Sequence, residues 1–513
     1  MNRILLQRLR AEKYKIDRRL GLARGGTAPR DSGPEFRAPR ARYELSRRTR
    51  AISCGGIGAI HNLVRSLGLA NTIDKGLSLL SQYRPYHESD HVLNIAYNFL
   101  CGGRSLDDLQ RLRRDGSYLR AVGARALPAP TTAGDFCRRF SSEDIETLMG
   151  LINNTRLEVW RRRGSALLGQ TARLDIDSSI VGTTGECREG MEMSYKGVWG
   201  YHPLMVSLAN TNEPLLLVNR SGNRPSAEGA PKLLDESVAL CRRAGFQRIL
   251  MRGDTAFSLT SNFDRWTDDG VHFVFGYIAS ASLRERADGI PEDEYETLTR
   301  KAERAFAEAQ NKKRRAKQPR VKQAVVVERG YKNMRLESED IAEFLHKPAR
   351  AKKSYRMIVL RKHIVEEQGQ LSLGTNIRYF FYVTNDPELT AEQVVFEANQ
   401  RCNQEKLIAQ LKSGVHSLTT PLNTLNANWA LMVMATLAWS LKAWLALTMS
   451  SSPRWRERHD AEREQLLRMS FRSFVLDFMM MPAQVIQTGR RQVFRLLAWR
   501  PCAHLLVRAL ANA

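Results

Sequence analysis

Between residues 172 and 278 the sequence alternates short apolar runs with amphipathic stretches, and this order constrains the fold more than any other feature. Strands are predicted for ARLDIDSSIVG, for two runs within YHPLMVSLANTNEPLLLVNRSGN that a polar turn joins, for RILMRGDTAF and for HFVFGYI. Helical periodicity occupies Ala230–Ala244 and Ser258–Gly270. The order β-β-β-α-β-α-β predicts an α/β core.

The rest of the 513 residues is too long to share one hydrophobic core with this unit. Apolar residues at i, i+3 and i+4 predict helices before the core, where a DNA-binding region and a plain helical bundle are both possible interpretations. The predicted organisation is a basic flexible arm at 1–50, a helical DNA-binding region at 51–165, core at 166–280, a β-rich insertion with a basic helix at 281–375, core again at 376–450 and a helical C-terminal region at 451–513.

One apolar stretch, Trp429–Met449, is as long as a membrane span. It contains Ser440 and Lys442 and directly follows a charged helical segment. We therefore expect a buried helix of a large protein and no membrane partner. Charged residues also interrupt the apolar residues at the start of the sequence, so no secretory signal is predicted.

The charge of the chain points to a polyanionic partner. Lys and Arg number 79 against 54 Asp and Glu, which gives a formal net charge of +25. A merely solvated basic surface is the alternative, and the run KKRRAKQPR at 312–320 is expected to contact a DNA backbone. The seven cysteines show no C-x-x-C spacing, so neither a zinc site nor a disulfide framework is predicted.

Two aspartates stand where predicted core strands end. Asp177 ends the first strand, and Asp175, which projects from the same side, is its rival. Asp254 ends the RILMRGD strand, although it could instead cap the next helix. A charged residue in an apolar run requires a reason, because burying a lone charge is costly. Strand ends are where open α/β sheets bind ligands, and Mg²⁺ prefers oxygen ligands, so a metal site is predicted.

A third acid, Glu405, lies in a predicted helix over Thr390–Ser413. Arg401, Glu405 and Lys412 are separated by four and seven residues, which places them on one helical face. Taken alone, this pattern is also that of an exposed i, i+4 ion pair. Beside two strand-end aspartates, the same face can hold a metal-binding carboxylate flanked by cations that grip phosphate.

The ordered set resembles the bacterial insertion-sequence transposases of the DDE type, most closely the insertion sequence 1380 group. The family motifs D-[small]-[ST], R-[AG]-D and Y-x₂-R-x₃-E-x₆-K are matched by Asp177-Ser178-Ser179, Arg252-Gly253-Asp254 and the series Arg401, Glu405, Lys412. Ala398 stands where the family has its tyrosine. Each motif is weak alone, but their order, at intervals of 77 and 151 residues, is specific, and the resemblance spans about residues 50–450.

The resemblance implies a ribonuclease-H-like core with two Mg²⁺ ions, or Mn²⁺ as a substitute, held by Asp177, Asp254 and Glu405. Arg252, Arg401 and Lys412 would contact DNA. The implied reaction is cleavage at a transposon end, with or without a DNA hairpin, followed by strand transfer into target DNA. The implied setting is a homodimer pairing two terminal inverted repeats in a bacterial cytoplasm. A non-transposing nuclease and a non-catalytic DNA binder on the same core are the alternatives.

Overall fold

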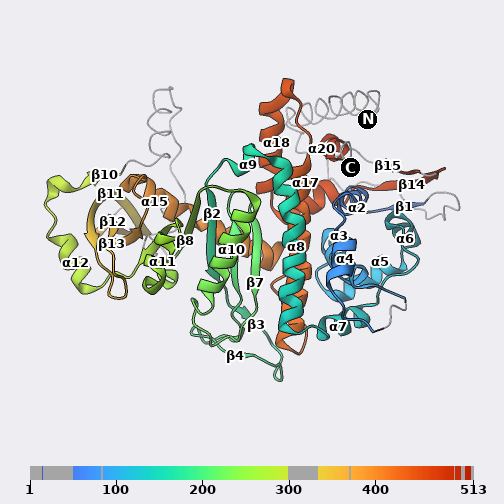
Figure 1. Cartoon of the computed structure of the whole chain (residues 1–513), viewed down its shortest axis with the longest axis horizontal. Helices are drawn as coiled ribbons and strands as arrows, with labels where there is room; N and C mark the ends of the chain where they lie inside the picture. The colour runs from blue at the N-terminus through green and yellow to red at the C-terminus, as the bar shows by residue number, and fades with distance from the viewer. Residues whose placement is uncertain are drawn as a thin grey trace, which may run out of the picture.

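The computed structural model describes Tyr14 and residues 50–81, 85–298, 333–368, 371–489, 491–497 and 503–509. Its elements lie in three neighbouring parts, with long insertion strands at one end, a core sheet in the middle and a helical assembly at the other end (Figure 1). The predicted basic arm, apart from Tyr14 and Arg50, and the KKRRAKQPR run lie outside the described residues.

Five strands of the middle part form the predicted core. Strand β2 lies in the middle of the five, antiparallel to β6 and parallel to β8, and the order in the sheet is β7-β6-β2-β8-β9. Along the chain the five strands and two helices follow the predicted β-β-β-α-β-α-β order, but three short strands that were not predicted lie between β2 and β6. The bounds are β2 Ala172–Ser178, β6 Leu204–Leu208, β7 Glu213–Val218, α10 Ala230–Ala244, β8 Ile249–Gly253, α11 Phe263–Asp268 and β9 His272–Tyr277. Helix α11 is shorter than expected, because two 3₁₀ turns, Thr255–Phe257 and Thr260–Asn262, precede it.

The strands of the predicted insertion continue the core sheet and do not form a sheet of their own. Strand β13 pairs antiparallel with β9 from Phe381 opposite Tyr277 to Thr384 opposite Val274, so the complete sheet has nine strands. The added strands are β10 Glu296–Thr297, β11 Asn333–His346, β12 Tyr355–Gln368 and β13 Leu371–Thr384. The basic helix predicted within 281–375 is not found at residues 292–297, which form a 3₁₀ turn and β10, and residues 299–332 lie outside the described residues.

A buried helix, α17 (Leu425–Thr448), organises the helical part. Its apolar window is entirely buried, which confirms the expectation of a core helix. It packs against α4, α7, α8, β7 and α18 (Arg456–Arg468). Trp444 of α17 donates a hydrogen bond to the buried Glu213 of β7. Glu213 also pairs with Arg156 of α8 at 3.0 Å. The helices before the core are α2 Ile57–Ser66, α3 Leu69–Gly76, α4 Glu88–Leu100, α5 Leu109–Arg114, α6 Gly116–Val122, α7 Pro130–Arg138, α8 Ser142–Arg163 and α9 Ser165–Leu168.

The prediction that the C-terminal region is wholly helical is wrong. Helices α18 (Arg456–Arg468), α19 (Phe471–Phe474) and α20 (Ala503–Ala509) are present, but β14 (Ala483–Thr488) and β15 (Arg491–Leu496) form a hairpin between them. Strand β14 also pairs with β1 (Ala51–Ile52), close to the other end of the chain. The missed signal was the alternation in AQVIQT and RQVFRL around Gly489, whose φ of +54° suits a turn.

Candidate active site

Strand β2 and the helices α15 (Ala391–Gln400) and α16 (Cys402–Ala409) present facing rows of charged side chains. Every second residue of a strand points to the same face, and every fourth residue of a helix stays near one face. Successive side chains on one face are about 6.6 Å apart along a strand and about 6 Å apart along a helix. Because these spacings are similar, each side chain of one row can face a side chain of the other. The strand row is Arg173, Asp175 and Asp177, and the helix row is Glu397, Arg401 and Glu405.

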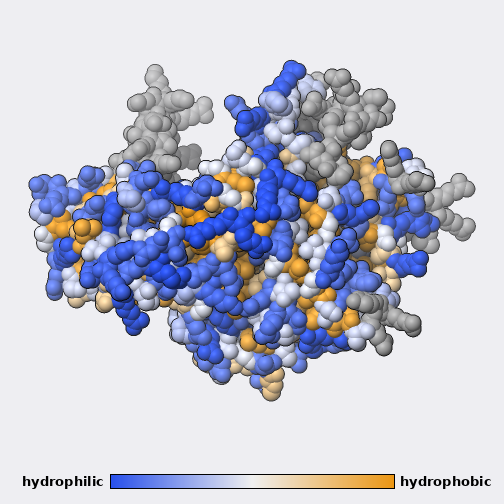
Figure 2. Space-filling view, viewed as in Figure 1, coloured by the Kyte–Doolittle hydropathy of each residue, from blue (hydrophilic) through white to orange (hydrophobic). Residues whose placement is uncertain are grey.

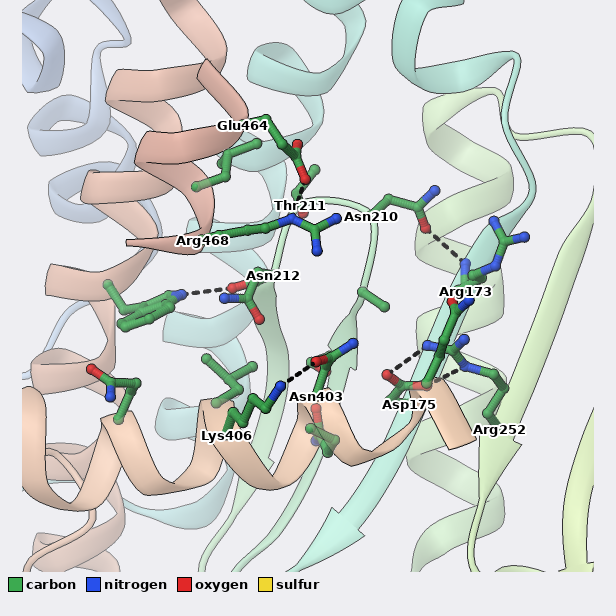
Figure 3. Close-up of a pocket in the computed structure, with 18 of the residues that line it drawn as sticks. Arg173, Asp175, Asn210, Thr211, Asn212, Arg252, Asn403, Lys406, Glu464 and Arg468 are labelled. Carbon is green, nitrogen blue, oxygen red and sulfur yellow. Dashed lines mark hydrogen bonds and ion pairs between the residues drawn. The ribbon is translucent and has the colours of Figure 1, made fainter. Parts of the chain in front are cut away.

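The first half of these rows is a closed network of ion pairs. Arg252, from β8, binds Asp175 through two hydrogen bonds of 2.6 and 2.9 Å (Figure 3). The same guanidinium reaches Glu397 at 2.7 Å. Arg173 binds the same Glu397 at 2.8 Å. Two arginines and two carboxylates balance one another. Burial disfavours the charged form of Arg252, but the two carboxylates outweigh burial and raise its pKa.

This network corrects the sequence-based role of Arg252 and decides between the rival aspartates. The side chains of Arg252 and Asp175 are each only 1% exposed. Arg252 directs its guanidinium at two carboxylates inside the protein, so the predicted DNA contact gives way to a role in holding β8, β2 and α15 together. Both oxygens of Asp175 accept hydrogen bonds from Arg252, which leaves Asp177 as the available acid of β2.

The second half of the rows is an open cluster of acids. In the parallel register of β2 and β8, Asp175 lies opposite Arg252, so Asp177 and Asp254 follow two positions later at the same edge of the sheet. Burial raises the pKa of Asp177 to about 6, and the negative charges of Asp254 and Glu405 add to the effect, whereas Arg401 opposes it. The strand register places Asp254 beside Asp177, and the ion pairs of Arg401 with Asp177 and Glu405 place the third acid near them.

Arg401 is the cation of this open cluster. Its guanidinium bridges Asp177 Oδ2 at 3.3 Å and Glu405 Oε1 at 3.2 Å. The i, i+4 pair expected as an alternative is therefore present. Three carboxylates and one arginine carry a formal charge of 1 − 3 = −2, and the Glu405 side chain is 60% exposed. The oxygens of the three acids are not all within 4.8 Å of one another, and Arg401 stands between two of them.

Asp254 also acts as the cap that the sequence offered as an alternative. Its Oδ1 accepts a hydrogen bond from Ala256 N at 2.9 Å and begins the 3₁₀ turn Thr255–Phe257. The turn folds back over the strand end, where a side chain on Gly253 would meet Phe257 Cβ at 2.9 Å. A glycine before the acid thus permits the sharp turn that presents Asp254 at the edge of the sheet.

Lys412 forms a hydrogen bond to the backbone just after Asp177. It lies in a π turn, η6 (Gln410–Gly414), and its Nζ donates to Ile180 O at 2.7 Å. Burial lowers the pKa of Lys412, and the nearby Lys196 lowers it further. Ala398, at the tyrosine position of the resembled family, is half-buried and packs against a small apolar cluster beside the sheet.

Two other features of the described residues lie apart from the three acids. Asp74, His87 and Glu88 offer ligand atoms within 4.8 Å of one another, but Asp74 already accepts from the backbone N–H and hydroxyl of Ser89, and Glu88 Oε1 accepts from two backbone N–H groups. This cluster joins α3 to the start of α4. A cavity of about 770 Å³ is lined by Arg173, Asp175 and Arg252 of the closed network and by residues of α16–α18, without Asp177, Asp254 or Glu405 among its lining (Figure 3).

Sequence reasoning did not identify Glu397 and Arg173, which complete the closed network. The spacing held a signal, because Glu397 precedes Glu405 by eight residues and so shares its helical face. Arg173 precedes Asp175 and Asp177 at intervals of two, which is the period of one strand face. Both residues position the elements that carry the acids.

Comparison with known proteins gives a family match. Residues 47–513 match the family model described as Transposase DDE domain group 1. Among solved structures, the chain is similar to a piggyBac transposase in a synaptic complex with hairpin DNA, at 11% identity and a TM-score of 0.32, over 83% of this chain and 87% of that one. No curated protein matched the chain. Since the family model covers nearly the whole sequence, the chain belongs to the DDE transposase family, domain group 1.

Proposed function

We propose that the protein is a DNA transposase that cleaves the ends of an insertion sequence and transfers them to target DNA, with Asp177, Asp254 and Glu405 as the catalytic acids. The observation that carries this proposal is the open cluster. Two acids end adjacent parallel strands, and a third faces them from α16. Family membership supplies the reaction class.

The donor set of the cluster fits two Mg²⁺ ions, or Mn²⁺ as a substitute. All three acids offer hard oxygen ligands, and their formal excess of negative charge favours divalent cations. When bound, the ions supply an activated nucleophile and stabilise the charge of the phosphate that is cut. Glu405 is exposed enough to move toward the two aspartates.

Arg401 links the metal-free cluster to DNA in this proposal. In the structure it neutralises part of the charge of Asp177 and Glu405. Once Asp177 and Glu405 held metal ions, the guanidinium of Arg401 would be free to grip a DNA phosphate through two parallel N–H donors. Lys412 keeps its bond to Ile180 O and fixes the direction in which the chain leaves Asp177.

We further assign the chain to the insertion sequence 1380 group and its five core strands to a ribonuclease-H-like core interrupted by the β10–β13 strands. The motif spacing around Asp177, Asp254 and Glu405 supports this assignment, while Ala398 departs from it. The net charge of +25 supports double-stranded DNA as the partner. In this proposal the 51–165 region binds the terminal inverted repeats. The protein forms a homodimer in the synaptic complex and acts on the bacterial nucleoid.

Cleavage of the element's own end tests the proposal. A labelled duplex that carries the DNA flanking the gene is incubated with Mg²⁺ or Mn²⁺ and with wild type, Asp254→Ala or Asp74→Ala. Asp74 is the matched control, because it is an acid of a second acidic cluster, in the helical part. We expect metal-dependent cutting by wild type and Asp74→Ala, and none by Asp254→Ala, while all three proteins bind the duplex.

Three outcomes would decide against this function. Equal cutting by wild type and Asp254→Ala refutes the assignment of the acids. Binding without cutting by the wild type, once two ends are shown to be paired in one complex, favours the non-catalytic DNA binder. A cut that ignores the terminal repeat and occurs equally on unrelated duplexes favours a general nuclease.

A further inference from the structure

The polar turn between β6 and β7 forms one wall of the cavity of about 770 Å³. Residues 209–212 make up this turn, and the other walls come from the closed network, from α16 and from the end of α18. Figure 3 shows Arg468 reaching in from α18 and Lys406 and Asn403 from α16. Small-molecule sites in proteins commonly have volumes of about 300–1,000 Å³, so this cavity is large enough for a ligand the size of a nucleotide.

Hydrogen bonds hold the polar turn in one conformation. Asn210 Oδ1 accepts from Arg173 N at 2.9 Å, and Asn210 Nδ2 donates to Thr171 O at 3.0 Å. Asn212 O accepts from the indole of Trp439 in α17 at 2.6 Å. Asn212 has a φ of +55°, a backbone conformation that asparagine adopts more readily than most residues do. This wall of the cavity is therefore preformed, which reduces the entropy lost when a ligand binds.

Two residues that line the cavity have buried polar groups without a partner among the described residues. Thr211 and Gln404 are each 1% exposed, and neither Thr211 Oγ1 nor Gln404 Nε2 makes a hydrogen bond. Ser207 Oγ donates to Gln404 Oε1, which fixes the orientation of the amide. A buried polar group without a partner costs free energy, and a ligand that hydrogen-bonds to it recovers that cost.

The exposed rim of the cavity carries cations. Arg468 has a side chain that is 75% exposed and pairs with Glu464 of the same helix. Lys406 is also exposed, and its Nζ donates to Asn403 Oδ1 at 3.3 Å. Helix α18 projects at the top of the view in Figure 1, and its surface there is hydrophilic in Figure 2. The cavity thus combines neutral hydrogen-bonding groups, which suit a base, with two cations that suit a phosphate.

The cavity lies on a different face of the α15–α16 segment from the acids. Arg401 and Glu405 lie on the face directed at β2. Gln400, Asn403 and Leu407, at intervals of three and four residues, line the cavity from another face of the same segment. Because none of the three acids lines the cavity, a ligand bound there would occupy a site separate from the open cluster.

We propose that this cavity binds a nucleotide. Lys406 and Arg468 hold its phosphate, and Thr211 Oγ1 and Gln404 Nε2 donate hydrogen bonds to its base. A free nucleotide and one nucleotide of a single DNA strand offer the same chemistry, and binding measurements distinguish these two sources. The proposal is independent of the proposed function, because it requires neither a metal ion nor cleavage.

Isothermal titration calorimetry in EDTA tests the proposal. Each of the four deoxynucleoside monophosphates, and inorganic phosphate, is titrated into wild type, Arg468→Ala and Arg458→Ala. Arg458 is the matched control, because it also pairs with an acid four residues away in α18 but does not line the cavity. We expect at least one nucleotide to bind wild type and Arg458→Ala equally, and to bind Arg468→Ala about ten-fold more weakly.

Thr211→Val separates binding from folding. The hydroxyl that this variant loses has no partner, so we expect an unchanged or higher melting temperature together with about five-fold weaker nucleotide binding. A single-stranded octanucleotide is compared with the mononucleotides in the same proteins. Tighter binding of the octanucleotide, weakened by Thr211→Val, identifies a DNA strand as the source, and tighter binding of a mononucleotide identifies the free nucleotide.

Four results would overturn the proposal. The first is that no nucleotide binds wild type, in which case the cavity holds only water. The second is that inorganic phosphate binds as tightly as the nucleotides, because the base would then contribute nothing. The third is equal weakening by Arg458→Ala and Arg468→Ala, which would indicate attraction to the general charge of α18. The fourth is an unchanged nucleotide affinity in Thr211→Val.

Discussion

The contact between β2 and the α15–α16 helices has two halves that are built from the same residue types but have different properties. At Asp175, two arginines and two carboxylates bind each other in a buried, charge-balanced network. At Asp177, two residues further along β2, three carboxylates lie at the edge of the sheet with one arginine, which pairs with two of them. The two halves differ in the number of arginines per carboxylate and in exposure to solvent. The residue types alone do not show this difference.

The contrast teaches where a charged pair holds the fold and where it can bind a ligand. A buried, fully paired network has no capacity for a further cation, and removing one member leaves an unpaired charge. An edge cluster with excess negative charge remains incomplete until cations arrive. The closed network fixes the positions of β2, β8 and α15, and this rigidity places the acids of the open cluster.

Breaking the closed network should have the largest effect on stability. Arg252→Met leaves Asp175 buried without a partner, and we expect the free energy of unfolding to fall by about 3–5 kcal/mol. Asp254→Asn, two residues beyond Arg252 and outside the network, should change it by less than about 1 kcal/mol. Urea unfolding followed by circular dichroism measures both. Similar losses in the two variants would remove the distinction between the halves.

The crowding of acids in the open cluster should make the free energy of unfolding depend on pH. The pKa of Asp177 is about 6 in the folded protein, above the usual 3.8, so the folded state binds the proton more tightly than the unfolded state does. Ionisation of Asp177 therefore costs stability as pH rises from about 4 to 6, and the cost is complete above 6. We compare the free energy of unfolding of Asp177→Asn with that of the wild type, without metal. Between pH 4 and pH 7 this difference should shift by about 1–3 kcal/mol in favour of the variant. A flat difference between the two proteins across this pH range would contradict the strained cluster.

Removing the cation of the open cluster should sharpen the comparison in another way. Arg401→Gln takes away the guanidinium that competes with cations for Asp177 and Glu405. We expect Mn²⁺ to bind about ten-fold more tightly, which corresponds to about 1.4 kcal/mol, while DNA cleavage falls. Isothermal titration calorimetry measures the affinity. Weaker Mn²⁺ binding in this variant would mean that Arg401 supports the metal site and does not occupy it.

The smallest effect is expected for the exposed acid of the helix row. Glu405 has a side chain that is 60% exposed, so Glu405→Gln should alter the free energy of unfolding by no more than about 0.5 kcal/mol. Glu397→Gln, eight residues earlier on the same face, removes a carboxylate bound by two arginines and should cost about 2–3 kcal/mol. Thermal unfolding of the pair provides the measurement, and equal losses would place both acids in the structural network.

The pattern of the sequence predicted the core well, because strand and helix periods are local. Helix α10 has the predicted bounds, and β8 ends at Gly253, directly before Asp254, as expected. Local patterns did not show that β13 pairs with β9, or that β1 pairs with β14 across more than 400 residues. Those pairings depend on contacts distant in sequence, which single-segment periodicity does not encode.

For the candidate site, residue types and spacing identified the acids but not their partners. The sequence favoured Asp177 over Asp175, and in the structure both oxygens of Asp175 accept hydrogen bonds from Arg252. It also predicted a DNA contact for Arg252, whose side chain is buried in this structure. An arginine directly before a strand-end aspartate has the same appearance whether it faces solvent or a buried carboxylate. Only the parallel register, with Arg252 opposite Asp175, distinguishes the two.

Direct measurement of bound Mn²⁺ tests the central claim that the open cluster is the metal site. Free Mn²⁺ is titrated by electron paramagnetic resonance against wild type, Asp254→Asn and Asp74→Asn, in the presence of uncleaved end DNA. The account predicts saturable Mn²⁺ binding in wild type and Asp74→Asn and its loss in Asp254→Asn, with the fold intact by circular dichroism. Unchanged binding in Asp254→Asn, or loss only in Asp74→Asn, would contradict the account and move the metal site to the helical part of the molecule.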